Sequence, residues 1–552
     1  MKRQIDADVT NPHWKTFDSL ERFSCTQVSL EIDEFVSDLV IELSVALNEV
    51  NQAKYSVRFW DRYIRSWLLS FVDTVFVEWL DYAVGRSSGQ QMPLTKALED
   101  VPRRASRSMN GALAISQDQR WRGQLKQDIQ SFLGGSSHNF LEATHLRDAA
   151  QTSRRFRSAL SRFLSMISSI TGQRPIVLAA NHFPWHARLA LSLSFFTLPT
   201  RSFEPNVGSA DYSIDSRLHI SEHLKKVSGQ GFEALVRALL PAYLPMSTVE
   251  LFSVLVQSCG VQQRKKPRVI FSDNQHFSSE SFALWIALQG ERGTQLAISQ
   301  HGGLNGQGLF QTRDEQIEIR IADAYLHWGW SVAPNAVRVP TLINTLTPRK
   351  LARRSRSVIM LVTDTTFRYR RKYWSDSDVY KRLVLRTFRG MPEHLKEMTT
   401  VRLHRDHDKY DESHKIFWNR EFPDAKLDDG FIPMRQLLRH ARLVICTTFG
   451  TTEIECFLRN IPVVLSLDPK LHRPRPEFAG LVDLFESVGL IHYSEESLHN
   501  FLQEQYVSLE VWWRSDDVQT AIAKYLDQFG HRSHQSIRDY RKVLKELAKK
   551  QH

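Results

Sequence analysis

The stretch QLAISQHGGLNGQGLF, Gln295 to Phe310, decides how the chain is interpreted. Its first half is an apolar run typical of a buried strand, and this run ends in His301. Glycine lets backbone N–H groups turn toward a ligand and approach it closely, which suits a phosphate or a sugar ring. We therefore expect a strand that opens into a ligand-binding turn; a flexible turn whose histidine is satisfied by backbone groups is the alternative. The small residues of this turn are Gly302, Gly303, Asn305, Gly306 and Gly308.

Short apolar runs, each followed by turn residues and a longer helical pattern, recur along the chain. Such alternation indicates parallel sheets with helices on both faces. We therefore predict the α/β class, with two Rossmann-like domains facing a cleft and a basic, proline-containing join at 334–356. Ligands of open α/β sheets bind beyond the carboxyl ends of the strands. The first series of runs is 174–181, 267–274, 294–301 and 323–330; the second is 357–364, 399–406, 441–448, 461–468 and 488–494.

Helical patterns flank these two series. Residues 33–82 predict helices with one apolar face, which we interpret as core, and residues 505–552 predict a helical tail with a solvated lysine face. The predicted domains are a mainly helical N-terminal region packed on the first lobe (1–172), the first lobe (173–340), the second lobe (341–505) and C-terminal helices (506–552). The residues of the apolar face are Trp60, Tyr63, Trp67, Phe71, Val75 and Trp79.

Charge and cysteine content limit the class of protein. The chain of 552 residues carries 72 Lys and Arg against 61 Asp and Glu, a net charge of +11 that favours an anionic partner. The basic residues are scattered and no nucleic-acid motif is present, so nucleic acid is the weaker choice. Four widely spaced cysteines and a start without an apolar leader core favour a soluble, cytoplasmic protein, with contact at a membrane surface left open.

A second candidate site is the stretch CTTFGTTEIE, Cys446 to Glu455, where an apolar run ends just before a helix expected to start near Glu453. Hydroxyl groups and N–H groups at a helix N-terminus form an anion site, since the helix dipole favours phosphate there. Alternatively, one of the threonines simply caps the helix, and both functions can hold together. Glu453 and Glu455 do not share one helix face, so at most one points into the cleft. The candidate phosphate-binding residues are Thr448, Gly450, Thr451 and Thr452.

Two further strand ends carry candidate residues. Asp273 is the acid best placed to act as a base or nucleophile, although an aspartate after a strand is more often a cap or turn residue. Arg402 could neutralise a diphosphate or a carboxylate. The histidines in HRDHDKYDESH (404–414) lack the spacing of a familiar zinc helix, so we expect a solvated loop and no metal set there.

Four segments resemble the LIC12162-type transferases of bacterial surface-polysaccharide gene regions. The chain departs from that family's pattern at Leu304–Asn305–Gly306 and at Phe449–Glu453, while hydroxyl groups persist at 451 and 452. The segments are LNEVNQAKYSVRFWDRYIRSWLLSFVDTVF (47–76), ISQHGGLNGQG with DEQIEIRIADAYLHWGW (298–330), CTTFGTTEIECFLRNIPVV (446–464) and VWWRSDDVQTA (511–521).

The resemblance implies a GT-B-like glycosyltransferase, distantly similar to enzymes that transfer CMP-activated ulosonic acids such as Kdo. It implies transfer of a sugar, or of a polyol phosphate, from a nucleotide donor to a glycan or lipid-linked acceptor in surface-polysaccharide or lipopolysaccharide synthesis. Basic residues and helix N-termini rather than a metal would stabilise the leaving nucleotide. The first lobe would then be the acceptor side and the second lobe the nucleotide-donor side, and no cofactor is expected.

On this basis the two candidate turns take different roles. Thr448 to Thr452, together with Arg402 and Glu455, would bind the donor. His301 would face the reacting carbon with its loop residues Gly302, Gly303, Asn305 and Gly306. His301, or Asp273, would take the acceptor's proton, and Asp273 would attack instead if configuration is retained. An epimerase or polyol-phosphate transferase on the same fold, a non-catalytic component of an assembly complex, and an RNA-binding protein remain alternatives.

Overall fold

The structure is a computed structural model. Every candidate site residue named above lies within the described part, whereas most of the predicted solvated loop, at 406–413, lies outside it. The structure describes residues 25–87, 104–116, 119–134, 175–179, 183–195, 210–227, 231–260, 266–309, 312–330, 333–342, 358–363, 377–405 and 414–550.

Contacts between residues divide the chain into two compact units, each described by itself. The first comprises Met1–Asn181, Phe195–Ala297 and Glu546–His552, and the second comprises His182–Ser194 and Ile298–Lys545. The boundary at residue 297 falls within strand β3 (Gln295–Ser299), which therefore belongs to both units. The domain limits expected from the sequence stay predictions.

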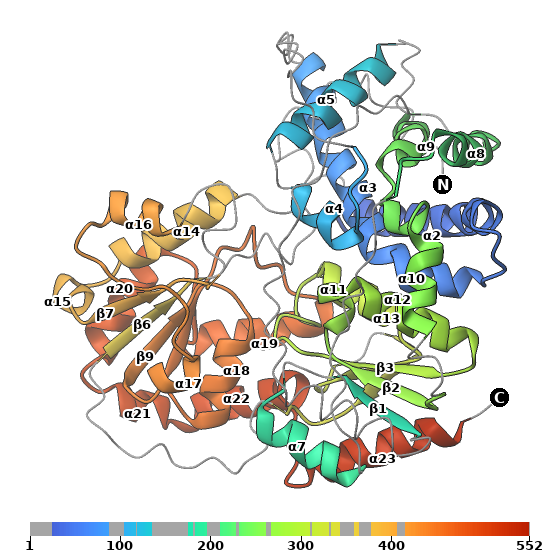
Figure 1. The fold of residues 1–552 in the computed structure, drawn as a ribbon. Helices are drawn as coiled ribbons and strands as arrows, with labels where there is room; N and C mark the ends of the chain where they lie inside the picture. The colour runs from blue at the N-terminus through green and yellow to red at the C-terminus, as the bar shows by residue number, and fades with distance from the viewer. Residues whose placement is uncertain are drawn as a thin grey trace. The chain divides into compact units, whose positions relative to one another are not determined.

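The first unit is mainly helical (Figure 1). Its longest helix, α3, packs against α2 and α12, and all six residues of the predicted apolar face are buried, which confirms that they are core. Trp60 stacks on Phe252 with ring centroids 5.0 Å apart. The helices are α2 (Cys25–Val50), α3 (Val57–Ser87), α4 (Met109–Ile115), α5 (Gln119–Leu133), α8 (Ile214–Lys225), α9 (Gly231–Tyr243), η2 (Met246–Thr248), α10 (Phe252–Gly260), α11 (Gln275–Ser278) and α12 (Glu280–Glu291).

A five-stranded sheet begins in the first unit and ends in the second. Its order is β1-β2-β3-β4-β5, and the pairs β1·β2 and β4·β5 are parallel. Its β4 and β5, with helices α7 and α13, belong to the second unit. The bounds are β1 (Ile176–Ala179), β2 (Val269–Ser272), β4 (Ala324–His327), β5 (Ala336–Arg338), α7 (Trp185–Ser194) and α13 (Arg313–Ile321).

A six-stranded parallel sheet forms the rest of the second unit, in the order β11-β10-β9-β6-β7-β8. Its core includes Ile359, Leu361, Leu443 and Ile445. The strands are β6 (Val358–Val362), β7 (Thr399–Arg402), β8 (Lys426–Asp428), β9 (Ala441–Cys446), β10 (Val463–Ser466) and β11 (Ile491–His492). The helices are α14 (Ser377–Arg389), α15 (Glu393–Lys396), α16 (His414–Glu421), α17 (Met434–Leu437), α18 (Thr451–Arg459), α19 (Pro476–Ser487), α20 (Glu495–Gln505), α21 (Leu509–Trp513), α22 (Asp516–Phe529) and α23 (Ser536–Lys549).

The predicted α/β class is confirmed in its two parallel sheets, its helical N-terminal region and its C-terminal helices. All nine predicted strands form. Two short strands were missed: β5 lies in the segment predicted as a join, and β8 carries the charged residues Lys426 and Asp428. Strands of three residues are too short to show a periodic pattern, so pairing with a neighbouring strand is what identifies them. Within the described part of the chain, no helix has the length and apolarity that a membrane span requires.

Candidate active site

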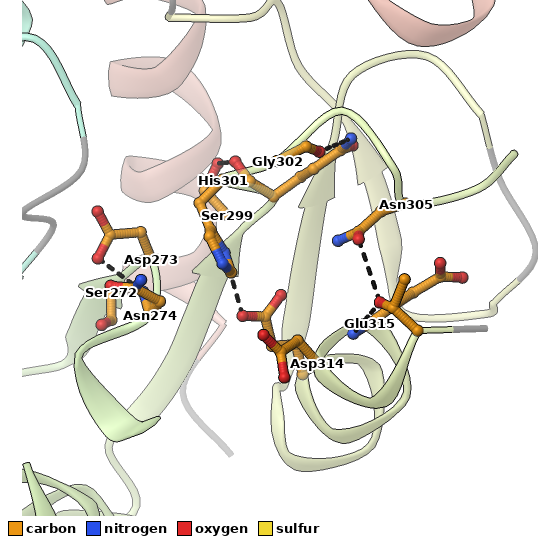
Figure 2. Close-up of polar contacts among 12 residues, drawn as sticks. Ser272, Asp273, Asn274, Ser299, His301, Gly302, Asn305, Asp314 and Glu315 are labelled. Atoms are coloured by element: carbon orange, nitrogen blue, oxygen red, sulfur yellow. Dashed lines mark hydrogen bonds and ion pairs between the residues drawn. The ribbon is translucent and has the colours of Figure 1, made fainter. Parts of the chain in front are cut away.

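The turn after β3 is fixed by a buried amide. Nε2 of Gln300 donates to the carbonyl of Gly302 at 2.7 Å (Figure 2). Its Oε1 accepts from the backbone N–H of Trp328 at 3.1 Å and from the indole N–H of Trp330 at 2.9 Å. Gln300 is fully buried. Because these three hydrogen bonds tie Gln300 both to Gly302 and to the residues after β4, the turn is held to the end of β4 and is not the flexible loop that the glycines alone would allow.

Asn305 and Gly306 are buried parts of this turn. Nδ2 of Asn305 donates to the hydroxyl of Tyr325 at 3.0 Å, and the N–H of Gly306 donates to Glu315 at 2.9 Å. Gly306 has φ +83°, and a Cβ at this position would lie 2.3 Å from the Trp330 ring. Both features require glycine. The structure therefore shows internal bonds for both residues, whereas the sequence suggested a surface that faces a ligand.

The second candidate turn follows β9 and leads into α18. Gly450 is the N-cap of this helix, and its N–H donates to Oε1 of Glu453 at 2.7 Å. The alternative prediction that Thr451 or Thr452 caps the helix is therefore wrong. The helix begins at Thr451, two residues before the expected start, because Glu453 satisfies the cap N–H from inside the first turn.

The two candidate turns touch each other within the second unit. The N–H of Gly303 donates to Oγ1 of Thr451 at 3.1 Å. A Cβ on Gly303 would lie 1.7 Å from the carbonyl oxygen of Gly450, so only glycine allows this approach. The turn after β3 and the mouth of α18 thus form one continuous surface. His301, Gly302, Thr451 and Thr452 are its half-buried members.

A buried chain of hydrogen bonds supports this junction from below. Nε2 of Gln307 donates to the carbonyl of Gly303 and, at 2.8 Å, to the hydroxyl of Tyr525. That hydroxyl donates in turn to Oε1 of Glu453 at 3.0 Å. The same carboxyl oxygen accepts from Gly450, so the bonds link the loop after β3 to the cap of α18.

Burial of Glu453 favours the protonated, neutral form of its carboxyl group. Burial raises the pKa of its carboxyl group to about 8, although hydrogen bonds from Gly450 and Tyr525 act in the opposite direction. A neutral carboxyl group at the start of α18 leaves the positive end of the helix dipole without an opposing charge. This arrangement suits an anionic ligand at the helix mouth.

His301 lies against a buried carboxylate. Its Nδ1 is 3.2 Å from Oε1 of Glu318, whose side chain is fully buried, whereas 15% of the His301 side chain is exposed. A carboxylate beside Nδ1 favours the tautomer with its proton on that nitrogen and stabilises the imidazolium form. Nε2 would then be the nitrogen that accepts a proton.

An ion pair fixes the far end of the turn. Arg475, at the start of α19, contacts Oε1 of Glu315 at 2.6 Å and donates from Nε to the carbonyl of Gly308 at 2.9 Å. Glu315 also binds Gly306, so one carboxylate holds both the arginine and the loop. Both side chains are buried.

Asp273 lies at the end of β2, the strand beside β3, and is fully buried. Its Oδ1 accepts from the N–H of Asn274 at 2.7 Å (Figure 2), a contact typical of a turn-forming aspartate. Arg402 at the end of β7 pairs with Asp428 and donates to the carbonyl of Gly430 at 3.0 Å. Each of these two candidates therefore already has partners in the protein.

The remaining donor-side candidates do not share one surface. The Thr448 side chain is buried, and its hydroxyl donates to the carbonyl of Phe449 at 3.1 Å. Glu455 pairs with Arg459 one turn along α18, at 3.1 Å, whereas Glu453 points inward. The structure thus brings Gly450, Thr451 and Thr452 to the loop of His301, while Thr448 and Glu455 are engaged elsewhere.

The supporting residues were not predicted from sequence. Glu315 and Glu318 lie within the segment DEQIEIR, three residues apart, so one face of α13 carries two acids. Acids at helical spacing beside Ile317 and Ile321 were a usable signal, because buried acids require partners. Gln307, Tyr525 and Arg475 gave no such signal, since each acquires its role only through a distant contact.

Three solved structures illustrate the likeness to known proteins. MurG of Acinetobacter baumannii has 12% identity, covers 67% of this chain and 98% of its own, and gives a TM-score of 0.34. The MnaA–UDP co-structure of S. aureus has 9% identity, covers 69% of this chain and 99% of its own, and gives a TM-score of 0.36. UGT71G1 of Medicago truncatula, complexed with UDP-glucose, has 10% identity, covers 70% of this chain and 100% of its own, and gives a TM-score of 0.35. Likenesses of this size carry no argument about residues or substrates.

A comparison with curated proteins gives no match. The model of the LIC12162 family transferases matches residues 4–544, nearly the whole chain. This match includes both turns of the candidate site and agrees with the resemblance seen in the four sequence segments. The chain belongs to the LIC12162 family of transferases.

Proposed function

We propose that this transferase moves a sugar from a nucleotide-activated donor to a surface-polysaccharide or lipopolysaccharide acceptor, as a GT-B glycosyltransferase. A CMP-linked ulosonic acid is the donor suggested by the family resemblance. The observation that carries the proposal is the hydrogen bond from Gly303 to Thr451 at 3.1 Å. It joins a histidine-containing strand end to a helix N-terminus, which are the two parts that this reaction needs.

The helix mouth is the proposed donor side. Backbone N–H groups and the hydroxyl groups of Thr451 and Thr452 would bind the donor phosphate, where the helix dipole favours negative charge. Thr451 accepts a hydrogen bond from Gly303, so its own hydroxyl proton can still be donated to a phosphate oxygen. The neutral state of Glu453 removes a repulsive charge from the same site. We propose no role for a metal ion in this step.

His301 is the proposed general base. Its Nε2 would accept the proton of the acceptor hydroxyl while that oxygen bonds to the anomeric carbon of the sugar. The bond from this carbon to the donor phosphate breaks, and the nucleotide leaves with the electron pair. Glu318 is a positioning residue, because its contact with Nδ1 orients the ring and stabilises the imidazolium that forms.

Asp273 is the second candidate for this chemistry. A retaining reaction would require its carboxylate to attack the sugar directly. Its complete burial and its bond to Asn274 favour a structural role, so we rank His301 first.

Other functions on the same fold remain open to test. An epimerase would convert a nucleotide sugar without any acceptor, and a polyol-phosphate transferase would move a phosphate-containing group. A non-catalytic component of a polysaccharide assembly complex would bind no nucleotide. The engaged Arg402 leaves the donor side with less positive charge than expected, so the threonines and the helix dipole carry the phosphate contact in this proposal.

We also propose that the protein is cytoplasmic and touches the membrane through α7. Trp185, Leu189 and Leu193 recur at helical spacing and are 66%, 49% and 65% exposed. Phe183, before α7, contacts Tyr540 of α23, whose Lys542 and Lys545 are exposed. An apolar stripe beside a basic helix suits an anionic lipid surface. Co-sedimentation with phosphatidylglycerol vesicles, and not with phosphatidylcholine vesicles, is the expected result; equal recovery with both would contradict it.

The function is tested in two steps. Thermal-shift measurements with CMP, UDP, GDP and dTDP should identify one nucleotide that raises the melting temperature, because a ligand that binds only the native form stabilises it. His301→Ala should then lower transfer from the matching donor by about a thousandfold or more without changing the melting temperature. Glu318→Gln should lower it by about ten- to a hundredfold. Near-normal turnover of His301→Ala would refute the assignment, and conversion without acceptor would indicate an epimerase.

A further inference from the structure

Three side chains from two helices of the first unit converge on one point. Nε2 of His219 and Nε2 of His223, both on α8, lie 2.7 and 2.6 Å from Oε2 of Glu49 near the end of α2. One ligand atom from each residue lies within 4.8 Å of the others. The two histidines are four residues apart, so they project from the same face of the helix.

The helix that carries the histidines is firmly anchored. Arg217, two residues before His219, is fully buried and forms an ion pair with Glu250 at 2.8 Å. Its guanidinium also donates to the carbonyls of Pro241 and Leu244. The backbone around His219 is thus held in place before any ligand binds, which lowers the cost of assembling a site.

The end of α2 is anchored as well. Asn48, next to Glu49, exchanges hydrogen bonds with the backbone of Tyr55 at 2.8 and 3.0 Å. Its Oδ1 also accepts from the indole N–H of Trp60 at 3.1 Å. The carboxylate of Glu49 is therefore presented from a fixed helix end, and its side chain is about half exposed.

The chemistry of this set is that of a zinc site. Two imidazoles and one carboxylate bind Zn²⁺ in many proteins, with water in the fourth position. Hard cations such as Mg²⁺ and Ca²⁺ prefer oxygen ligands, so two histidines disfavour them. We propose that Glu49, His219 and His223 bind one divalent transition-metal ion of the Zn²⁺ class, joining α2 to α8.

The distances require only a small adjustment. Metal–ligand distances of about 2.0–2.2 Å place the ligand atoms of a tetrahedral site about 3.3 Å apart. The nitrogen–oxygen distances of 2.6 and 2.7 Å must therefore open by about 0.6–0.7 Å. The exposed positions of His219 and Glu49 allow this movement. In the neutral imidazoles the proton shifts from Nε2 to Nδ1, which leaves the Nε2 lone pair for the metal.

A hydrogen-bonded clamp without metal is the competing interpretation. Glu49→Gln separates the two, because the glutamine Oε1 still accepts a hydrogen bond from an imidazole N–H but is a poor metal ligand. Metal binding does not involve the proposed transfer site, so this inference stands apart from the proposed function.

The test uses the full chain. Calorimetry with Zn²⁺ and absorption spectroscopy with Co²⁺ should show one site of 1:1 stoichiometry with the spectrum of a low-symmetry, four-coordinate ion. His219→Ala and His223→Ala should each weaken Zn²⁺ binding by at least about a hundredfold, and Glu49→Gln by at least about tenfold. His394→Ala, which removes an exposed histidine elsewhere, should leave it unchanged.

Each alternative result overturns the proposal. Unchanged stoichiometric binding after replacement of both histidines would place the ion elsewhere. If Glu49→Gln bound Zn²⁺ as tightly as the unchanged protein, Glu49 would not be a metal ligand. Its contacts with the two histidines would then be hydrogen bonds only. Circular dichroism of the metal-free variants checks their folding, and Glu49→Gln, which preserves the clamp, keeps the test decisive if an alanine variant unfolds.

Discussion

The turn after β3 and the turn after β9 look alike in sequence but differ in their packing. In the first, Gly303 and Gly306 press against other protein atoms, with a Cβ distance of 1.7 Å to Gly450 and of 2.3 Å to Trp330. In the second, Gly450 has an extended backbone, and a Cβ there would have only Oε2 of Glu453 nearby, at 4.0 Å. Glycine is obligatory at positions 303 and 306 of the first turn and replaceable at position 450 of the second.

This difference shows what glycine signals in a strand-end loop. In the sequence, the glycines of this turn suggest room for a ligand. In the structure, the missing side chain of Gly303 instead lets two segments of the protein approach each other closely. The residues available to a ligand are instead the half-buried ones beside that contact, His301 and Gly302 on one side and Thr451 and Thr452 on the other. A glycine-rich turn thus builds the site mainly by bringing other groups together.

The largest effect is expected for Gly303→Ala. Its Cβ would overlap the backbone carbonyl of Gly450, which has no rotamer by which to move away. We expect the free energy of unfolding of the second unit to fall by about 3 kcal/mol or more, measured by urea denaturation.

Gly302→Ala is the matched control for this variant. A Cβ on Gly302 would lie 4.0 Å from Oγ1 of Thr451, an ordinary contact, so its effect should stay below about 1 kcal/mol. Equal stability of the two alanine variants would show that the two turns do not approach as closely as described.

Glu453→Gln tests the buried bonds beneath the junction. Since the pKa of Glu453 is raised to about 8 from 4.5, the folded protein holds a proton that the unfolded chain releases between these pH values. Its contribution to stability is therefore complete below pH 4.5 and is lost as the pH rises toward 8. The slope of this loss approaches about 1.4 kcal/mol per pH unit.

The glutamine variant should lack this dependence, because its amide does not ionise in that range yet can still accept hydrogen bonds from Gly450 and Tyr525. Urea unfolding of both proteins at pH 5, 6, 7 and 8 measures the difference. Parallel pH profiles would mean that Glu453 is ionised like an exposed carboxylate.

Thr451→Val should have a smaller effect. The valine keeps the shape of the side chain but removes the acceptor for the N–H of Gly303, at a cost of about 1–2 kcal/mol in unfolding free energy. Thr452→Val, at the next half-buried position, should cost less than about 0.5 kcal/mol. If the two valine variants unfold at the same urea concentration, the hydrogen bond between the turns makes no measurable contribution to stability.

A small effect is also expected for Gly450→Ala. The extended backbone and the open space around its Cβ leave only the weaker capping tendency of alanine, worth less than about 1 kcal/mol. Thermal unfolding of this variant beside Gly303→Ala gives the contrast directly, and a large loss of stability at Gly450 would remove the distinction between the turns.

Much of the fold could be predicted from the sequence, because short apolar runs followed by turn residues and a helical pattern are typical of buried parallel strands. β5 and β8 were missed since their residues are strand-like only through pairing. Both candidate turns were also visible in the sequence, each as a strand end with small or hydroxyl side chains. Their direct contact was not predicted, because the two turns were assigned to different lobes, one on the acceptor side and one on the nucleotide-donor side.

The partners of these residues could not be predicted in the same way. Arg402 seemed available to a ligand, but Asp428 lies on β8, a strand that the sequence did not reveal. Likewise, Glu318 behind His301 and Tyr525 behind Glu453 are brought together by tertiary packing over long separations in the chain. The residue types in the sequence indicated which chemistry a side chain could perform. Burial and pairing with other side chains in the fold decided which of these groups remain accessible to a ligand.

The most direct test of a shared site is nucleotide binding by the double variant Thr451→Val, Thr452→Val. Calorimetry with the nucleotide identified by thermal shift should show an affinity at least about tenfold weaker than that of the unchanged protein, because two hydroxyl donors to the phosphate are lost. The unfolding midpoint, measured in parallel, separates this loss from destabilisation. An unchanged affinity in the folded double variant would contradict a donor site at the mouth of α18.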